Sequence, residues 1–279
     1  MKKRGQFTLF VVLGVVLLLV VGAVMYYNGN LSSVYSSLSG GVSLPSQVQE
    51  VADHVQECVD TSAYEAVVNI GYTGGYYSLP ALSYIDSNLS YVVPYYLYDG
   101  VDSSLSSDAL SSELNAYISS LVTSCVYFEQ FSSFTITSGE ISVDSTIDQN
   151  VVSVEVSYPL VVGVDQESYT LSDPYTTEVS ANLGWLHDIA QQIVVYDIAN
   201  PDTIDYTNLL SYGVSNILVA PVSNDTYVYV LQDTSSGIGN YSFFFAEYSS
   251  TLVSDDECVL DLDCSDGFVC TDGACEEEE

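Results

Sequence analysis

The distribution of charge constrains this chain more than any other feature of its sequence. It holds 37 Asp and Glu against only three Lys and Arg, a formal net charge of -34, and the three cations are Lys2, Lys3 and Arg4. Within residues 5–279, therefore, no salt bridge from a Lys or Arg can form. Such an acidic surface repels phosphate backbones, which excludes direct nucleic-acid binding, and the sequence contains no Gly-rich phosphate loop with its lysine.

The composition is nevertheless that of a folded protein. Hydrophobic residues make up 48% of the chain, with 24 Tyr and 9 Phe, whereas disordered acidic chains are poor in such residues. A net charge this large opposes compaction unless it is screened. The Debye length falls from roughly 8 Å at 0.15 M salt to roughly 3 Å at 1 M. We therefore expect either a high-salt setting or neutralisation of the surface by divalent cations such as calcium.

An apolar run without any charge covers residues 7–27. A helix of about 20 residues spans the bilayer core, and basic flanks stay on the cytoplasmic side. The pattern predicts a single-pass membrane protein with a cytoplasmic N-terminus and its ectodomain outside. A buried core helix would not explain why every Lys and Arg precedes this run. A cleaved secretory signal would have a shorter apolar stretch, followed by a small-residue site that residues 28–31 lack.

Residues 3–6, Lys-Arg-Gly-Gln, resemble the class III signal of archaeal type IV pilins and archaellins. The resemblance implies that a prepilin peptidase cuts between Gly5 and Gln6 and leaves the apolar helix at the mature N-terminus. The acidity is similar to that of surface proteins from extremely halophilic archaea. Pilin helices often continue into the head, whereas residues 28–46 are rich in Gly and Ser and predict a flexible tether.

Hydrophobic periodicity predicts the elements of an ectodomain over residues 47–253. Helical spacing indicates helices over 46–71, with Ser46 as N-cap, over 108–127 and over 185–199. Period-two alternation indicates strands between the second and third helices and after the third. Because helices and strands come in runs rather than alternating, we expect an α+β fold with a mostly antiparallel sheet.

Six cysteines in a chain expected outside the cell indicate disulfides. Cys58 and Cys125 fall on the inward faces of the first two predicted helices. A bond between them would close a loop of about 68 residues and contribute roughly 4 kcal/mol in the chain-entropy model. The alternative is a metal site, since His54 precedes Cys58 by one helical turn.

The other four cysteines form a separate C-terminal module, residues 254–279, which ends in an acidic tail. They are Cys258, Cys264, Cys270 and Cys275. A segment this short cannot fold on apolar burial alone, and the C-x-x-C spacing of zinc sites is absent. Of three possible connectivities, our hypothesis is Cys258 with Cys270 and Cys264 with Cys275. A structural calcium ion, held by Asp261, Asp263 and Asp272, is the one cofactor that the sequence suggests.

Four Asn-x-Ser/Thr sequons predict glycosylation at one or more sites. They lie at Asn30, Asn88, Asn224 and Asn240. In a chain expected to face outward, these asparagines are reachable by a glycosylation system.

No motif predicts a catalytic site. There is no G-x-S-x-G elbow, the adjacent His187 and Asp188 point in different directions on a helix, and 37 acids offer no way to choose a catalytic pair. The aromatic-dense residues 91–100 are a candidate recognition loop. We expect a non-catalytic cell-surface protein whose partners are the lipid bilayer and either copies of itself in a filament or other surface proteins and glycans. The alternative is a membrane-tethered envelope hydrolase or solute-binding module.

Overall fold

The computed structural model describes residues 44–86, 91–201, 203–249, 268–271 and 274–277. The described residues from Glu50 onward belong to one compact unit. Among the described residues, no helix is long and apolar enough to span a membrane. The predicted span at 7–27 and the predicted cleavage between Gly5 and Gln6 lie outside the described residues, as does nearly all of the tether.

The first described helix, α3 (Ser46–Tyr72), follows its predicted periodicity. Val48, Val51, Val55 and Val59 are all fully buried. The prediction of Ser46 as N-cap is wrong by one residue. The carbonyl of Pro45 accepts hydrogen bonds from the amides of Val48 and Gln49, which is the role of the N-cap carbonyl, so Ser46 already belongs to the first turn.

The two following long helices also match their predicted positions. In α4 (Ser107–Cys125), the side chain of Ser106 caps the first turn by accepting from the amide of Ala109. Its buried face is Leu110, Leu114, Ile118 and Val122, whereas Tyr117 and Leu121 are half-buried. In α5 (Leu183–Ala199), the buried side chains include Leu186, Ile189 and Ile193.

A larger sheet forms one wall of the head. Its strand order is β1 (Ser83–Asp86), β2 (Tyr91–Tyr98), β12 (Gly239–Tyr248), β11 (Thr226–Ser236) and β10 (Asn216–Pro221), and β3 (Val101–Asp102) also pairs with β2. All of these pairs are antiparallel except β2 with β12. The short helix α6 (Tyr206–Ser211) precedes β10.

The prediction of a recognition loop over residues 91–100 is wrong. This segment is β2, which lies between β1 and β12, followed by a turn in which Asp99 and Gly100 have positive φ. Val93, Tyr96 and Leu97 are buried. The aromatic density therefore belongs to a strand covered on both faces, which has a near-continuous apolar sequence rather than an alternating one.

Two small antiparallel sheets complete the head, and η1 (Glu129–Phe131) is a short 3-10 helix ahead of them. Alternation in β6 buries Val152, Val154 and Val156, which fits the period-two pattern predicted between the second and third helices. The fold is thus α+β with mixed, mostly antiparallel sheets. In one of these sheets the strand order is β4 (Thr135–Ser138), β7 (Leu160–Val164) and β8 (Glu167–Leu171). In the other it is β5 (Ser142–Ile147), β6 (Val152–Ser157) and β9 (Tyr175–Val179).

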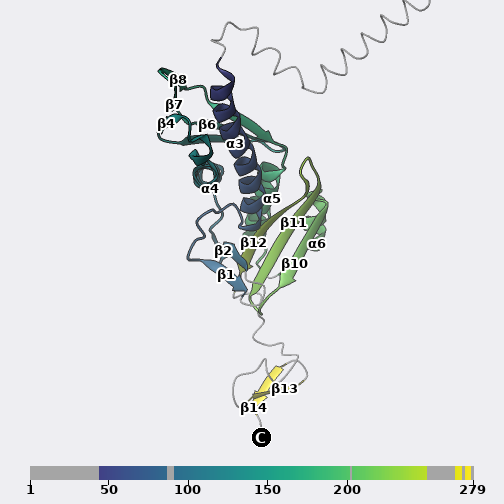
Figure 1. Ribbon diagram of the computed structural model, residues 1–279. Coiled ribbons are helices and arrows are strands. Elements are labelled where there is room, and N and C mark those ends of the chain that lie inside the picture. Colours follow the sequence, from purple (N-terminus) through teal and green to yellow (C-terminus); the bar gives the residue numbers. More distant parts are fainter. Residues whose placement is uncertain (1–43, 87–90, 202, 250–267, 272–273, 278–279) are drawn as a thin grey trace, which may run out of the picture. The chain divides into compact units, whose positions relative to one another are not determined.

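Helix α5 packs against β12, and α3 also contacts this strand (Figure 1). The Tyr241 hydroxyl donates to the Val67 carbonyl of α3 over 2.8 Å. Phe243 is two residues beyond Tyr241 in β12, and its ring contacts the ring of His187 in α5. Nearer its N-terminus, α3 reaches β9 of a small sheet, because Gln56 donates to the Thr176 carbonyl over 3.1 Å. Helix α3 therefore links the larger sheet to a smaller one.

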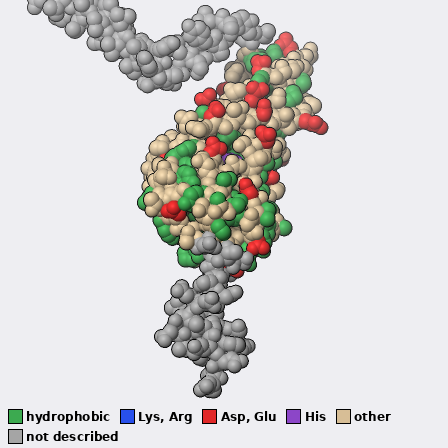
Figure 2. Space-filling model, turned by 180° about the vertical axis from the view of Figure 1, so that it is seen from behind, with side chains coloured by type: hydrophobic (Ala, Val, Ile, Leu, Met, Phe, Trp, Pro, Cys, Tyr) green, Lys and Arg blue, Asp and Glu red, His purple; other side chains and the backbone are tan. Residues whose placement is uncertain are grey.

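The surface of the head is acidic and contains no opposite charge. Figure 2 shows Asp and Glu side chains scattered between hydrophobic patches, with no Lys or Arg among the described residues. A separate hairpin pairs β13 (Phe268–Thr271) with β14 (Ala274–Glu277) and sets Cys270 opposite Cys275 in the backbone register.

Candidate functional site

Two carboxyl groups and a tyrosine meet on the helix-covered face of the larger sheet. Asp197 lies in the last turn of α5, Tyr229 in β11 and Glu247 near the end of β12. Every second side chain of a strand points to the same face, so Glu247 follows Phe243 and Phe245 toward α5. All three of these β12 side chains are buried. Glu247 thus places a carboxyl group on the face of β12 where Phe243 and Phe245 place aromatic rings.

Hydrogen bonds connect the three polar side chains. The Tyr229 hydroxyl donates to Oδ2 of Asp197 over 3.0 Å. The carboxyl groups of Asp197 and Glu247 also share a hydrogen bond. A hydrogen bond between two carboxyl groups requires a proton on one of them, so the pair holds at least one proton. The ring of Tyr229 stacks on Phe245 at 4.8 Å between centroids, which restricts the position of the hydroxyl.

Burial controls the protonation of this acid pair. It raises the pKa of Glu247 well above the ordinary value, and the negative charge of Asp197 raises it further. Burial also raises the pKa of Asp197, although the hydrogen bonds from Glu247 and Tyr229 oppose that shift. Because no Lys or Arg lies beyond residue 4, none can supply a compensating charge here. Glu247, only 6% exposed, therefore keeps its proton at pH values where surface glutamates are ionised.

A cavity of about 120 Å³ lies beside the acid pair. Glu247 and Tyr229 line its buried end, and Asn200 and Thr203 lie at its exposed rim. The Oε1 atom of Glu247 is buried and has no hydrogen-bond partner among the described residues. Since a cavity of about 150 Å³ can hold benzene, this one has room for roughly that size or a little less.

This arrangement can hold a proton, donate or accept hydrogen bonds, or bind a cation. Glycosidic cleavage uses two carboxyl groups about 5 to 9.5 Å apart, with the sugar between them. Here the carboxyl groups of Asp197 and Glu247 are hydrogen-bonded to each other, and the cavity is too small for two sugar rings. The geometry is therefore unlike that of the carboxylate-pair chemistry that the sequence left open.

Asp233 shows a second way to bury an acid in this chain. Its side chain is 1% exposed and accepts hydrogen bonds from Asn182, Ser215 and Ser235, the shortest being 2.7 Å from Asn182. Burial alone would raise the pKa of Asp233, but these hydrogen bonds prevail and lower it. Asp233 is thus a satisfied carboxylate that joins β11 to the start of α5, whereas burial raises the pKa of Glu247 and leaves its Oε1 without a partner among the described residues.

His187 is a core residue, only 1% exposed. Its Nε2 lies 2.9 Å from the Leu105 carbonyl, which also accepts from Gln191 over 2.7 Å. The rings of Tyr96 and Phe243 pack edge-on against it. Burial lowers the pKa of His187, so the neutral ring donates through Nε2 to the main chain. That nitrogen is engaged by a carbonyl and not by a serine or an acid.

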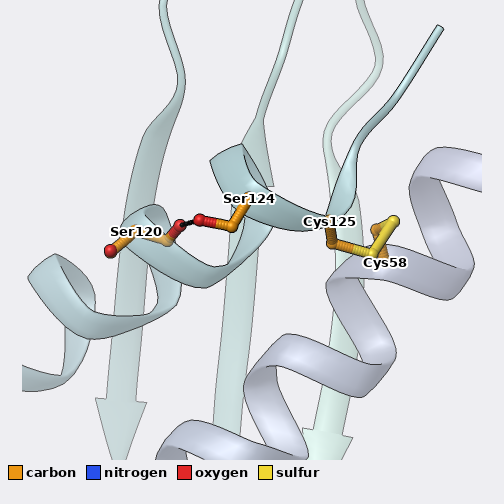
Figure 3. Close-up of a disulfide and its surroundings, with 4 residues drawn as sticks. All are labelled: Cys58, Ser120, Ser124 and Cys125. Atoms are coloured by element: carbon orange, nitrogen blue, oxygen red, sulfur yellow. Dashed lines mark hydrogen bonds between the residues drawn. A yellow bond between two sulfur atoms is a disulfide. The ribbon is translucent and has the colours of Figure 1, made fainter. Parts of the chain in front are cut away.

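The predicted disulfide between Cys58 and Cys125 is confirmed, with a Cα–Cα distance of 5.6 Å (Figure 3). It joins α3 to the C-terminus of α4, in the turn where Ser124 donates to the Ser120 carbonyl over 2.9 Å. The alternative metal site is wrong, because the sulfur of Cys58 is in the disulfide. The ring of His54 packs instead against Phe131, at 5.6 Å between centroids.

The described residues include only some of the other predicted sites. Asn224 lies in the exposed turn before β11, and Asn240 is exposed at the start of β12, so both asparagines are accessible to a glycosylating enzyme. Of the C-terminal module, only the backbone register of Cys270 and Cys275 is described. The sites outside the described residues are Gly5, Gln6, Asn30, Asn88, Cys258, Asp261, Asp263, Cys264 and Asp272.

Sequence reasoning missed Asp197, Tyr229 and Glu247. Among 37 acids, composition does not distinguish the buried ones. One signal was available: Glu247 directly follows the apolar run 243–246 and is two residues beyond the buried Phe245, so it points to the same face as Phe243 and Phe245. Charge inside an apolar strand pattern indicates a buried acid.

The fold and the site define this protein as an α+β chain with a buried acid pair beside a small cavity. Comparison with protein-family models, with curated proteins and with solved structures finds no match. Function is therefore inferred from the chain's own residues.

Proposed function

We propose that this chain is a non-catalytic cell-surface protein, anchored by residues 7–27 with its α+β head outside the cell. It acts in filament assembly or cell contact after cleavage between Gly5 and Gln6. The observation that carries the proposal is the disulfide between Cys58 and Cys125. Such bonds persist in oxidising compartments and are rare in the cytosol. Lys2, Lys3 and Arg4 all precede the apolar run, which supports the same orientation.

The surface supports an external, high-salt setting. Without Lys or Arg, the head's carboxylates are screened by salt or by bound cations rather than by ion pairs with basic side chains. Exposed apolar side chains such as Tyr127, Leu210 and Leu218 offer contact area for copies of the chain or for other surface proteins and glycans. Asn224 and Asn240 are glycosylation sites in this proposal.

Mass spectrometry of the mature N-terminus tests the processing. A chain beginning at Gln6 supports the pilin-like route, and an intact Met1 overturns it in favour of a plain signal anchor. Alkylation of the native chain without reductant tests the compartment, because modified Cys58 or Cys125 would contradict an oxidising one. Filaments in micrographs of the producing cells, lost on deletion of the chain, would establish assembly.

The second class, a tethered envelope hydrolase or solute-binding module, has one observation in its favour. The cavity beside Asp197 and Glu247 has room for a molecule of about the size of benzene or a little smaller. The acid pair favours binding over hydrolysis, because its carboxyl groups are hydrogen-bonded to each other, whereas those of glycosidases are held apart by the sugar.

A further inference from the structure

Glu247 presents an unsatisfied oxygen beside a cavity. Its side chain is 6% exposed and lines the cavity, and Oε1 has no hydrogen-bond partner among the described residues. Folded proteins pair nearly all buried polar atoms, because an unpaired one loses its water without replacement. Oε1 itself has almost no accessible surface, so a donor from outside the chain reaches it only when the carboxyl group turns toward the cavity.

The charge of this donor follows from the composition. The cavity lining includes three acids, Asp99, Asp197 and Glu247, and the chain has no Lys or Arg beyond residue 4. A cation in the cavity would be attracted by these acids, and burial would shield that attraction from salt. The ligand is therefore positively charged and carries hydrogen-bond donors.

The walls distinguish an organic cation from a metal ion. Leu97, Ile198, Pro201 and Ile204 make much of the lining apolar. Calcium takes six to eight oxygen ligands, and the described residues contain no group of three or more His, Cys, Asp or Glu able to hold a metal ion. A ligand with an apolar body and a charged end fits both parts of the cavity.

We propose that this cavity binds a small primary amine in its ammonium form. The ammonium donates to the carboxyl groups of Glu247 and Asp197, and its alkyl part packs on Leu97, Ile198 and Ile204. An ammonium has three N–H donors and no acceptor, which matches an acid pair that lacks donors of its own once ionised. Binding displaces the proton held by the pair, so one proton is released for each amine bound. The inference goes beyond the proposed function and does not depend on the anchor or on filament formation.

Isothermal titration of the full chain, purified in detergent and molar KCl, tests this binding with n-butylammonium chloride. The neutral isostere 1-butanol is the matched ligand control. We expect saturable binding of butylammonium, with proton release visible as a dependence of the heat on buffer, and binding of butanol at least about tenfold weaker. Equal affinities for both ligands, or no binding of butylammonium, would overturn the proposal.

Two variants locate the site. Glu247→Gln keeps the side-chain size but cannot ionise, and we expect it to weaken butylammonium binding at least about tenfold. Glu178→Gln removes the same formal charge from an exposed position on β9, and we expect a change within about twofold. Equal weakening by both variants would mean diffuse attraction to the acidic surface and would refute a site at Glu247.

Two further ligands show whether the ammonium comes from a partner's lysine or a free amine, and whether a metal ion binds instead. These titrations use the wild-type chain, so they test the proposal even if Glu247→Gln does not fold. Binding of Nα-acetyl-lysine methylamide as tightly as butylammonium assigns the ammonium to a lysine side chain of a partner. Binding of butylammonium alone assigns it to a free amine. Saturable binding of CaCl₂ that displaces butylammonium would replace the amine by a metal ion and overturn the proposal.

Discussion

Replacing Glu247 by glutamine should stabilise the protein increasingly as the pH rises from acid to neutral. Burial raises the pKa of Glu247 in the folded state, with the charge of Asp197 adding to the shift. Below the unfolded-state pKa of about 4.3, both states hold the proton and the group adds no pH dependence. Above it, the unfolded chain loses the proton while the folded chain retains it. Stability is therefore lost until the pH passes the raised folded-state pKa.

The size of this effect follows from proton linkage. While the folded state holds up to one more proton than the unfolded state, the free energy of unfolding falls by up to about 1.4 kcal/mol per pH unit. Glutamine has no such term, and its amide can still donate to Asp197. Between pH 4 and pH 7, the free energy of unfolding of Glu247→Gln should therefore rise relative to that of the wild type by at least about 1 kcal/mol.

Urea unfolding between pH 4 and pH 8, followed by the fluorescence of Trp185, measures this difference. Trp185 lies in α5 and is the single tryptophan of the chain. Molar KCl suppresses repulsion between surface carboxylates, which would also lower stability as the pH rises. Glu178→Gln is the matched control, because it removes one exposed carboxylate, and its curve should parallel the wild type. If the Glu247→Gln curve also parallels the wild type, Glu247 is not protonated in the folded state and the reasoning is wrong.

Four further results are expected. Removing the disulfide with Cys58→Ala and Cys125→Ala should lower the free energy of unfolding by about 4 kcal/mol, since their sequence separation of 67 defines a long loop. Urea titration with and without reductant measures this loss. Gly71→Ala should cost about 1–3 kcal/mol, because a Cβ there would overlap the Ser242 carbonyl of β12, whereas Gly163→Ala has ordinary contact distances and is the control for thermal unfolding. Asp233→Asn should cost about 1–3 kcal/mol at pH 7, since it removes one acceptor oxygen from buried donors; the loss should shrink in acid as the wild-type carboxylate protonates, and a pH-independent loss would contradict this account. Trypsin should leave residues 5–279 uncut even in urea, and a fragment from within this range on a gel would show that basic residues are not confined to positions 2–4.

Helix prediction succeeded where one amphipathic face is buried against a sheet. The positions of α3, α4 and α5 follow from apolar residues at helical spacing, and the inward positions of Cys58 and Cys125 on that pattern indicated their disulfide. Prediction failed at residues 91–100, because a strand buried on both faces lacks the alternation that identifies a half-buried one. Pro94 and the neighbouring tyrosines then suggested a loop, although Pro94 lies opposite Ser83 in the register of β2 with β1.

The sequence by itself determined the charge balance, the three long helices and the strands that follow α4, because these depend on composition and on spacing along one segment. It also predicted the disulfide, since two inward cysteines on amphipathic helices limit the pairing. Only the tertiary structure decided which of 37 acids are buried and how each is satisfied. Asp233 meets donors from residues 182 and 215, and Glu247 meets Asp197 from α5, so their opposite protonation depends on contacts between distant segments. Burial and hydrogen bonding are properties of the assembled fold, which is why no local pattern separates a neutral acid from an ionised one.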